Sequence, residues 1–495
     1  SINETWISDR DRFSYEGLNH ESRALKPKIK VDGEWQETDW QQALQFAVDG
    51  IKNNAINPDQ MGVLASKHAS LEEFYLMQKL ARKFGSENID FRLDQTQLST
   101  GSSLESSINL SEIESVDHAL IIGSYTRLEQ PMINHRIRKA TLDGASVNTM
   151  NSKNFDFNFK TKCDALTAPQ KLLSALQSVL KAVNLKTNQD IPNDLSDVIP
   201  SEIHNVIADD LIASENGVIV LGEHLNSNPN SLAIINLIQK IASTTNLKIA
   251  NITISGNSHS AEKANFIPSD KGLNAISMFI DNVKAYLLMD VDSEYDFIDS
   301  KSAQGHFSKE DIFVVALSSF ENQSLLRSAD VILPMASFYE SSGTHINFDG
   351  FVQSYSASVK SPGESKPGWK IIKVMADLLD LEGFDYVDST QVKEEALQSS
   401  KMKSSFDEVN IQSIDDSQVT THWQYAPYAS DSVTRRAKAL QESNVGMINK
   451  AYVSKMTAQK IGLSDDDLYL GVPVSIEESV AEDYVFIHTN QARRA

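Results

Sequence analysis

Residues 329–353, ADVILPMASFYESSGTHINFDGFVQ, carry the strongest fold signal in this 495-residue chain. The stretch opens with an apolar run at 331–334 that has the length of a buried strand and ends in proline. Residues typical of a loop with a defined conformation follow this run: Gly343, Thr344, Asn347 and Gln353. Because glycine and asparagine favour tight turns, the stretch predicts a strand that runs out to a defined loop. In open α/β sheets such loops border the ligand cleft.

Strand–helix–strand patterns surround this stretch. A short buried strand at 61–65 leads to a capping box at Ser70, a helix from residue 71, and a stop at Gly85. Further strands are expected at 119–123, 145–150, 217–222, 247–251, 285–290, 311–317 and 331–334, and helices at 132–142, 231–242 and near 321–327. Strands joined through helices of this length pair in parallel by right-handed crossovers. The chain is therefore expected to be an α/β protein.

The length predicts roughly three or four domains. We expect two doubly wound, Rossmann-like domains, separated in sequence by the acidic stretch 186–200, with a small N-terminal remnant and a partial β-rich C-terminal segment. The boundaries place the remnant at 1–45, the discontinuous first α/β domain at 46–165 with 336–435, the inserted second α/β domain at 166–335, and the start of a β-rich domain or arm at 436–495. Strand-like runs at 468–474 and 484–487 support this last unit.

Composition excludes several classes of partner. The net charge of −22 argues against nucleic acid, which needs a concentrated basic face. The short basic run at 435–438 is expected to be a solvated helix end. No apolar run approaches the roughly 20 residues of a membrane-spanning helix, so direct membrane insertion is not expected. The lone Cys163 rules out a disulfide framework and indicates a reducing, cytoplasmic compartment. The start has no signal-peptide pattern and no initiator methionine, so a fragment or a processed product is expected.

No catalytic group stands out from the sequence. The 11 histidines lack the spacing of a zinc site, and no glycine-rich phosphate loop follows any strand. Gly123 ends a strand where a doubly wound sheet would bind a ligand, but the bulky residues at 124–129 suit a plain strand-to-helix connection better. The alternating charges at 9–12, flanked by aromatic residues, indicate an interface segment.

Nearly the whole chain resembles the molybdopterin oxidoreductases, most weakly at 192–210. The run WISDRDRFSYEGL at 6–18 is specific to one branch, the large iron–sulfur subunit of bacterial NADH:quinone oxidoreductase (respiratory complex I). The run KPKIKVDGEWQETDWQQAL at 26–44 is shared by the superfamily. Agreement continues at 72–75, 130–138, 329–353, 362–369 and 431–440. The resemblance implies a fold of the formate dehydrogenase and DMSO reductase type.

The departures from the family pattern concern cofactor binding. In cofactor-bearing relatives an Asn-x-Asp run is followed by a cysteine, selenocysteine or serine that ligates molybdenum, whereas here residues 88–90 lead into a stretch without a thiol. Three serines follow a little further along the chain, so a serine ligand to molybdenum is not excluded. They are Ser99, Ser102 and Ser103. Phe351 stands where relatives have an arginine suited to pterin phosphates. The resemblance thus implies a vestigial cleft without a cofactor, a metal ligand or a catalytic residue, lined by Gly123, Arg127, Gly343, Thr344, Asn347 and Gln353.

The resemblance also implies a role. In that branch, cysteines N-terminal to the Trp6 motif bind the iron–sulfur clusters, so this chain is expected to be the cluster-free part of the subunit. It would be an inactive scaffold in an NADH:quinone oxidoreductase, bound to other peripheral-arm subunits, in the cytoplasm and peripheral to the membrane. Two alternatives stay open: an active molybdenum or tungsten oxidoreductase with a serine ligand, and a free-standing protein that binds a small polar ligand in the cleft.

Overall fold

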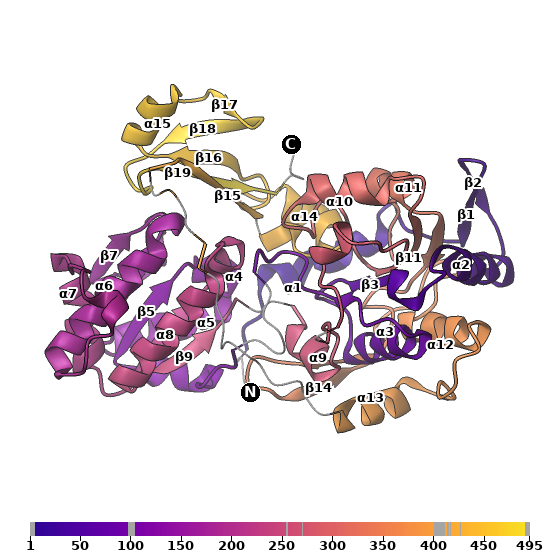
Figure 1. Ribbon diagram of the computed structural model, residues 1–495, viewed down its shortest axis with the longest axis horizontal. Helices are drawn as coiled ribbons and strands as arrows, with labels where there is room; N and C mark the ends of the chain where they lie inside the picture. Colours follow the sequence, from indigo (N-terminus) through magenta and orange to yellow (C-terminus); the bar gives the residue numbers. More distant parts are fainter. Residues whose placement is uncertain are drawn as a thin grey trace.

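The computed structural model describes residues 5–97, 104–253, 256–269, 271–399, 411–412, 415, 417–425 and 427–490. The molecule contains two helix-covered sheets, a C-terminal sheet and a two-stranded hairpin (Figure 1). The first sheet lies at the right of Figure 1, the second at the left, and the C-terminal sheet, in yellow, above the second. Within the described ranges, no helix is both long and apolar enough to cross a membrane.

The first sheet has seven strands in the order β2-β1-β12-β11-β10-β3-β4. The strands are β1 (Lys28–Val31), β2 (Glu34–Glu37), β3 (Met61–Ala65), β4 (Ile89–Asp90), β10 (Ala285–Met289), β11 (Phe313–Ser318) and β12 (Val331–Pro334). Strands β12, β11, β10, β3 and β4 pair in parallel, and the β1–β2 hairpin adds to β12 in antiparallel fashion. The carboxyl ends of the parallel strands therefore meet at one edge of the sheet.

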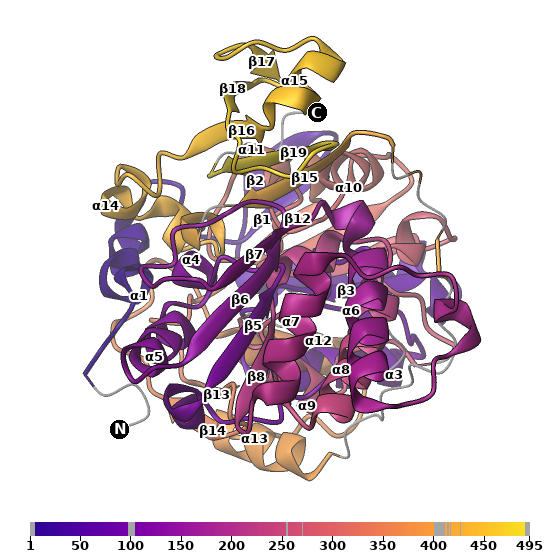
Figure 2. The same ribbon diagram turned by 90° about the vertical axis from the view of Figure 1, so that its left-hand side faces the viewer.

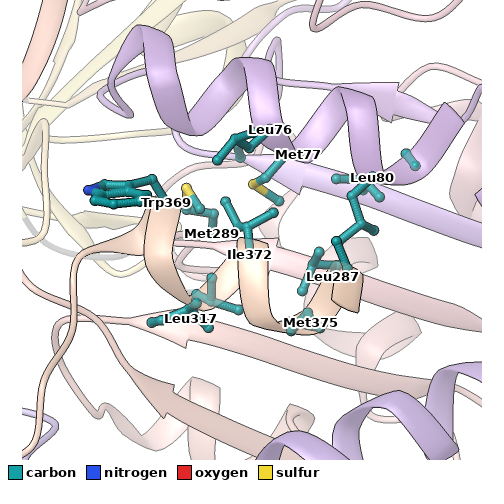
Figure 3. Close-up of a cluster of buried hydrophobic side chains, with 14 of the residues drawn as sticks. Leu76, Met77, Leu80, Leu287, Met289, Leu317, Trp369, Ile372 and Met375 are labelled. Atoms are coloured by element: carbon teal, nitrogen blue, oxygen red, sulfur yellow. The ribbon is translucent and has the colours of Figure 1, made fainter. Parts of the chain in front are cut away.

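Side-chain alternation divides the first sheet between two apolar cores. Val63, Leu287 and Leu317 point to one face, where they pack with three helices. These helices are α2 (Trp40–Asn54), α3 (Leu71–Phe84) and α12 (Gly368–Leu378). Figure 3 shows that Ile372 of α12 packs between α3 and the strands. Leu64 and Tyr286 point to the other face, which is covered by α10 (Ser300–Phe307) and α11 (Gln323–Ser328).

The second sheet has five parallel strands in the order β7-β6-β5-β8-β9. They are β5 (His118–Ile122), β6 (Ser146–Asn151), β7 (Cys163–Leu166), β8 (Gly217–Leu221) and β9 (Lys248–Asn251). Helices cover both faces, as Figure 2 shows for the face nearest the viewer. The helices are α5 (Pro131–Leu142) on one face and α6 (Leu172–Thr187), α7 (Glu202–Ala213) and α8 (Ser231–Thr245) on the other.

The C-terminal sheet has five strands in the order β15-β19-β16-β18-β17 and mixes parallel with antiparallel pairs. The strands are β15 (Thr420–Tyr425), β16 (Asn449–Val453), β17 (Leu468–Tyr469), β18 (Val472–Ile476) and β19 (Tyr484–Thr489). The remaining elements are a hairpin, β13 (Gly343–Ile346) with β14 (Val352–Tyr355), and the helices α1 (Asp9–Phe13), α4 (Thr126–Glu129), α9 (Ser258–Lys263), α13 (Ser389–Gln398), α14 (Lys438–Gln441) and α15 (Lys455–Ile461).

Strand pairing corrects the expected division of the chain. Strands β5 and β6, assigned from sequence to the first domain, pair with β8 and β9 in the second sheet. Strands β10, β11 and β12, assigned to the second domain, lie beside β3 in the first sheet. The stretch 186–200, expected to separate the domains, lies inside the second unit between α6 and α7. Buried parallel strands all have similar, continuously apolar sequences. The local sequence of a strand therefore does not indicate which other strand it pairs with.

The capping box at the start of α3 forms as expected. Ser70 Oγ accepts from the backbone N–H of Glu73 at 3.3 Å, and Glu73 Oε2 accepts from the backbone N–H of Ser70 at 2.9 Å. At the other end, Gly85 adopts the left-handed conformation, with φ of 107°, that lets the helix end.

Replacing Ser70 with alanine is expected to lower the free energy of unfolding by about 1 kcal/mol, because a helix N–H and a buried carboxylate oxygen lose a partner. Urea denaturation measures the loss. Ser8→Ala, which removes the same cap from α1, is the control and should cost less, since α1 has no buried residue. An equal effect at the two sites would contradict the expectation.

Candidate functional site

A large cavity, of about 720 Å³, lies at the carboxyl ends of parallel strands from both helix-covered sheets. The loops after β3 and β4 supply 66–68 and 91–94, and the loops after β5 and β8 supply 125–132 and 223–227. Open α/β sheets bind ligands at this place, because side chains from several strands converge there. The cavity is therefore the candidate site.

Segments far away in sequence complete the walls. The N-terminal residues 6–12 and the segment 427–430 lie on one part of the lining, and strand β15 contributes His422, Trp423 and Gln424. The alternating charge run that predicted an interface thus makes one within the chain, because Arg10 on α1 pairs with the buried Asp431 at 3.0 Å.

Four of the five lysine and arginine side chains of the cavity pair with carboxylates of the same chain. Lys67 contacts Asp94 at 2.8 Å, and Arg127 contacts Asp156 at 2.6 Å. A third, Arg435, pairs with Asp296 and stacks its guanidinium 4.5 Å from the ring of Tyr295. Counting all charged groups, the lining carries six carboxylates and five basic side chains: Asp9, Asp11, Asp94, Glu129, Glu223 and Asp296 against Arg10, Arg12, Lys67, Arg127 and Arg435. The site has no excess of positive charge.

A buried acid–histidine pair lies where the second sheet meets the C-terminal sheet. Glu129 Oε1 lies 3.1 Å from His224 Nε2 and also accepts from Gln424 Nε2 at 3.0 Å. Burial is the largest single influence on the pKa of His224 and lowers it, but the charge and hydrogen bond of Glu129, together with Gln424 and Glu223, raise that pKa above its ordinary value. Burial would likewise raise the pKa of Glu129, but His224 draws it down. Because Gln424 belongs to β15, its hydrogen bond to Glu129 also links the C-terminal sheet to the loop after β5.

This pair predicts a pH-dependent contribution to stability. The raised pKa of His224 makes the contribution fully present below about pH 6.5, and it is lost as the pH rises through the folded-state value. The lowered pKa of Glu129 preserves it down to about pH 4.3. The difference in unfolding free energy between the natural chain and Glu129→Gln should therefore shrink as the pH rises above about 6.5 and through the raised pKa of His224. Urea denaturation across this range measures it, and a constant difference would contradict the prediction.

The structure brings few of the sequence-predicted cleft residues to the cavity. Arg127 lines it, and Gly123 lies at the end of β5 with a φ of 62° against Leu225. Gly343 and Thr344 lie instead in the β13–β14 hairpin, outside the cavity lining.

Hydrogen bonds explain why the hairpin residues are structural. Thr344 donates from its backbone N–H and from Oγ1 to the buried carboxylate of Glu72, at 2.9 and 2.7 Å. Asn347 Oδ1 accepts from the backbone of Asp349 and Phe351 and so closes its own turn. Gln353 is exposed on β14. The Gly-Thr-to-Gln stretch therefore anchors a hairpin on α3.

Of three further sequence expectations, only the first differs from the structure. The basic run at 435–438 is not wholly a solvated helix end, since Arg435 is buried among carboxylates. Burial raises the pKa of Cys163, which lies on β7 away from the cavity, so its neighbouring lysines do not activate it. The candidate serine ligands Ser99, Ser102 and Ser103 fall outside the described residues.

Sequence reasoning missed the pairs that shape the cavity, namely Glu129 with His224 and Arg435 with Asp296. Each pair joins segments far apart in the chain, and no local pattern marks them. The only available signal was position, because both carboxylates follow a strand end by a few residues.

Known proteins share this architecture. The sequence model of the family described as molybdopterin oxidoreductase matches residues 23–378, most of the chain. The chain belongs to the molybdopterin oxidoreductase family. Its fold is similar to that of acetylene hydratase from Pelobacter acetylenicus, with a TM-score of 0.68, 13% identity, and coverage of 96% of this chain and 86% of that one.

Two curated relatives of the chain are subunits of NADH oxidoreductases. The G subunit of the NADH-quinone oxidoreductase of Rickettsia bellii is 28% identical over 399 residues, which cover 77% of this chain and 50% of the relative. The NADH-ubiquinone oxidoreductase 75 kDa subunit of Reclinomonas americana is 25% identical over 406 residues, covering 77% of this chain and 52% of the relative. The chain thus spans about half the length of these relatives. The resemblance drawn from the sequence is confirmed.

Proposed function

We propose that this chain is a non-catalytic scaffold within an NADH:quinone oxidoreductase. The observation that carries the proposal is the pairing of the cavity's cations with the chain's own carboxylates, seen in Arg10–Asp431, Lys67–Asp94 and Arg435–Asp296. The similarity to the Rickettsia bellii relative, a subunit of NADH-quinone oxidoreductase, suggests the complex in which such a scaffold would act.

The family's pterin cofactor is a poor fit to this cavity. Its phosphates need unpaired arginine or lysine donors and close backbone approach, and its metal needs a thiolate, selenolate or hydroxyl ligand. Here the lining has one more carboxylate than basic side chains, and bulky Tyr125 and Arg127 fill the loop after β5. The sole cysteine lies elsewhere, on β7. In the part of the chain that the structure describes, no cluster of histidine, cysteine and acidic side chains could hold a metal ion.

The scaffold would act through surfaces rather than through the cavity. We propose that its partners are other peripheral-arm subunits, that iron–sulfur clusters are carried by a different part of the parent subunit, and that the assembly lies on the cytoplasmic side of the membrane. The exposed aromatic residues beside α1, Trp6 at 58% and Tyr15 at 52% exposure, are suited to such contacts.

Affinity purification of the parent polypeptide from its own host tests the proposal. We expect NADH dehydrogenase activity and iron–sulfur absorbance in the purified complex, and no molybdenum or tungsten in stoichiometric amount. Stoichiometric molybdenum or tungsten would favour the oxidoreductase with a serine ligand. A polypeptide that purifies alone would favour the third candidate, a small-ligand binding protein that uses the 720 Å³ cavity.

A further inference from the structure

A second, small cavity of about 30 Å³ lies at the carboxyl end of the first sheet. Three neighbouring parallel strands each end beside it. Asp290 follows β10, Ser319 follows β11, and Ser337 comes shortly after β12. The segment 431–433 also lines the cavity. Side chains from three strand ends thus converge on one small space.

Three of the oxygens on the lining have no hydrogen-bond partner among the described residues. Ser319 is 1% exposed and Ser337 is 4% exposed, yet neither Oγ makes a hydrogen bond within the described structure. The buried Oδ1 of Asp290 is equally without a described partner, although its Oδ2 accepts from Ser432 Oγ at 2.7 Å. Leaving one buried polar atom unpaired costs about 1–3 kcal/mol. Three such atoms around one cavity point to an occupant that binds oxygen.

The charges on the lining favour a cation as the occupant. Among the described residues, no lysine or arginine lines the cavity, whereas Asp290 and Glu73 both do. Glu73 makes its hydrogen bonds with Ser70, a neutral residue. The third acid, Asp431, is already paired with Arg10, and burial lowers the pKa of His68 to about 3, which keeps that ring neutral. Burial raises the pKa of both Asp290 and Glu73, which means that each carboxylate is costly to keep charged unless a positive group lies beside it.

We propose that this cavity binds a hydrated alkali-metal cation through Asp290 Oδ1 and the hydroxyl oxygens of Ser319 and Ser337. One unpartnered carboxylate oxygen with two neutral hydroxyls matches a single positive charge, whereas calcium sites use several carboxylates. The volume of about 30 Å³ exceeds the roughly 10–15 Å³ that one water-sized occupant needs, so an ion and a water fit. The bound ion would tie β10, β11 and β12 together beside the segment 431–433.

Thermal unfolding of the intact chain in different chlorides tests the site. Sodium, potassium and choline chloride are compared at equal ionic strength, so that general screening cancels. We expect the midpoint temperature to rise by a few degrees with sodium or potassium, to saturate with concentration, and not to rise with choline. Equal midpoints in all three salts would overturn the proposal and leave the cavity to water.

Two sets of variants locate the effect. Asp290→Asn, and separately the double variant Ser319→Ala with Ser337→Ala, should lose the cation-specific rise. Asp330→Asn is the matched control, because Asp330 is a partly buried carboxylate at the amino end of β12, away from the cavity. It should keep the rise. If the double serine variant retains the full rise, or if the control loses it, the assignment to this cavity is wrong.

Crystals grown with rubidium chloride give a direct reading. Rubidium is an alkali cation with a strong anomalous signal, so we expect an anomalous peak inside the cavity next to Asp290. No peak there, with ordered water in its place, would overturn the proposal even if the melting data showed salt specificity. This outcome is independent of whether the chain acts as a scaffold, since the scaffold proposal does not use the cavity.

Discussion

Replacing Arg23 with alanine is expected to lower the free energy of unfolding by about 3–5 kcal/mol. Arg23 donates from two guanidinium nitrogens to the two carboxylate oxygens of Glu340, at 2.9 and 2.7 Å, and both side chains are almost fully buried. Removing the arginine leaves a buried carboxylate whose other partner is the backbone N–H of Ser337. The pair links the N-terminal segment to the loop after β12. Urea denaturation followed by tryptophan fluorescence measures the loss.

Two comparisons make the Arg23 result specific. Lys26→Ala, which removes a solvent-exposed pair with Glu37 at 3.0 Å, should leave the midpoint unchanged, because solvent screens that pair. Replacing both partners, with Arg23→Met and Glu340→Leu, should recover much of the loss, since no charge is then stranded. If Arg23→Ala unfolds at the same urea concentration as the natural chain, the buried pair does not stabilise the fold.

The second large effect is expected at Ile372 in α12. Its side chain is fully buried between α3 and the first sheet, in contact distance of the cluster that includes Leu76, Met77, Leu287 and Leu317 (Figure 3). Ile372→Ala should lower the free energy of unfolding by about 2–5 kcal/mol, because burial of apolar surface is lost and a cavity remains. Denaturation by urea, with the slope fitted separately, measures the change.

The same helix offers the control. Val374 is 40% exposed on the outer side of α12, and Val374→Ala should change the free energy of unfolding by at most about 0.5 kcal/mol. Similar losses for Ile372→Ala and Val374→Ala would mean that α12 itself, rather than its apolar face, is the sensitive element.

Local structure could be predicted from the sequence with few errors of position. Strand β3, the cap at Ser70, the stop at Gly85 and strand β12 lie where apolar runs and turn residues predict them. Each depends on interactions within a few residues, such as a serine hydroxyl and a helix N–H three positions away. The family could be identified as well, because the runs at 6–18 and 26–44 carry it.

The grouping of strands could not be predicted in this way. Residues 119–123 and 285–290 are equally apolar runs of strand length, yet they lie in different sheets. The pairing is decided by which strand edges and apolar faces meet once all helices are docked. That is a property of the whole chain, and two parallel strands in one sheet carry no complementary local code.

The residues of the candidate site were likewise only partly predictable from the sequence. Arg127 could be found because it follows a strand end, but the partners that neutralise the cavity's cations come from distant segments, as Asp431 does for Arg10 and Asp156 for Arg127. Asn347 and Thr344 were expected in the cleft, and their hydrogen bonds instead build the β13–β14 hairpin. A residue's type predicts which bonds it can make, whereas the partner it meets depends on the fold.

Residue types and near neighbours in the chain were enough to establish the α/β class, the family, the helix caps and the scarcity of thiols. The folded arrangement was needed to establish which strands share a sheet, which cations of the cavity are neutralised, and which oxygens surround the small cavity at Asp290. The physical reason is that these ion pairs and cavities form between segments far apart in the chain. Their energies depend on distance and burial, and both quantities exist only once the chain has folded.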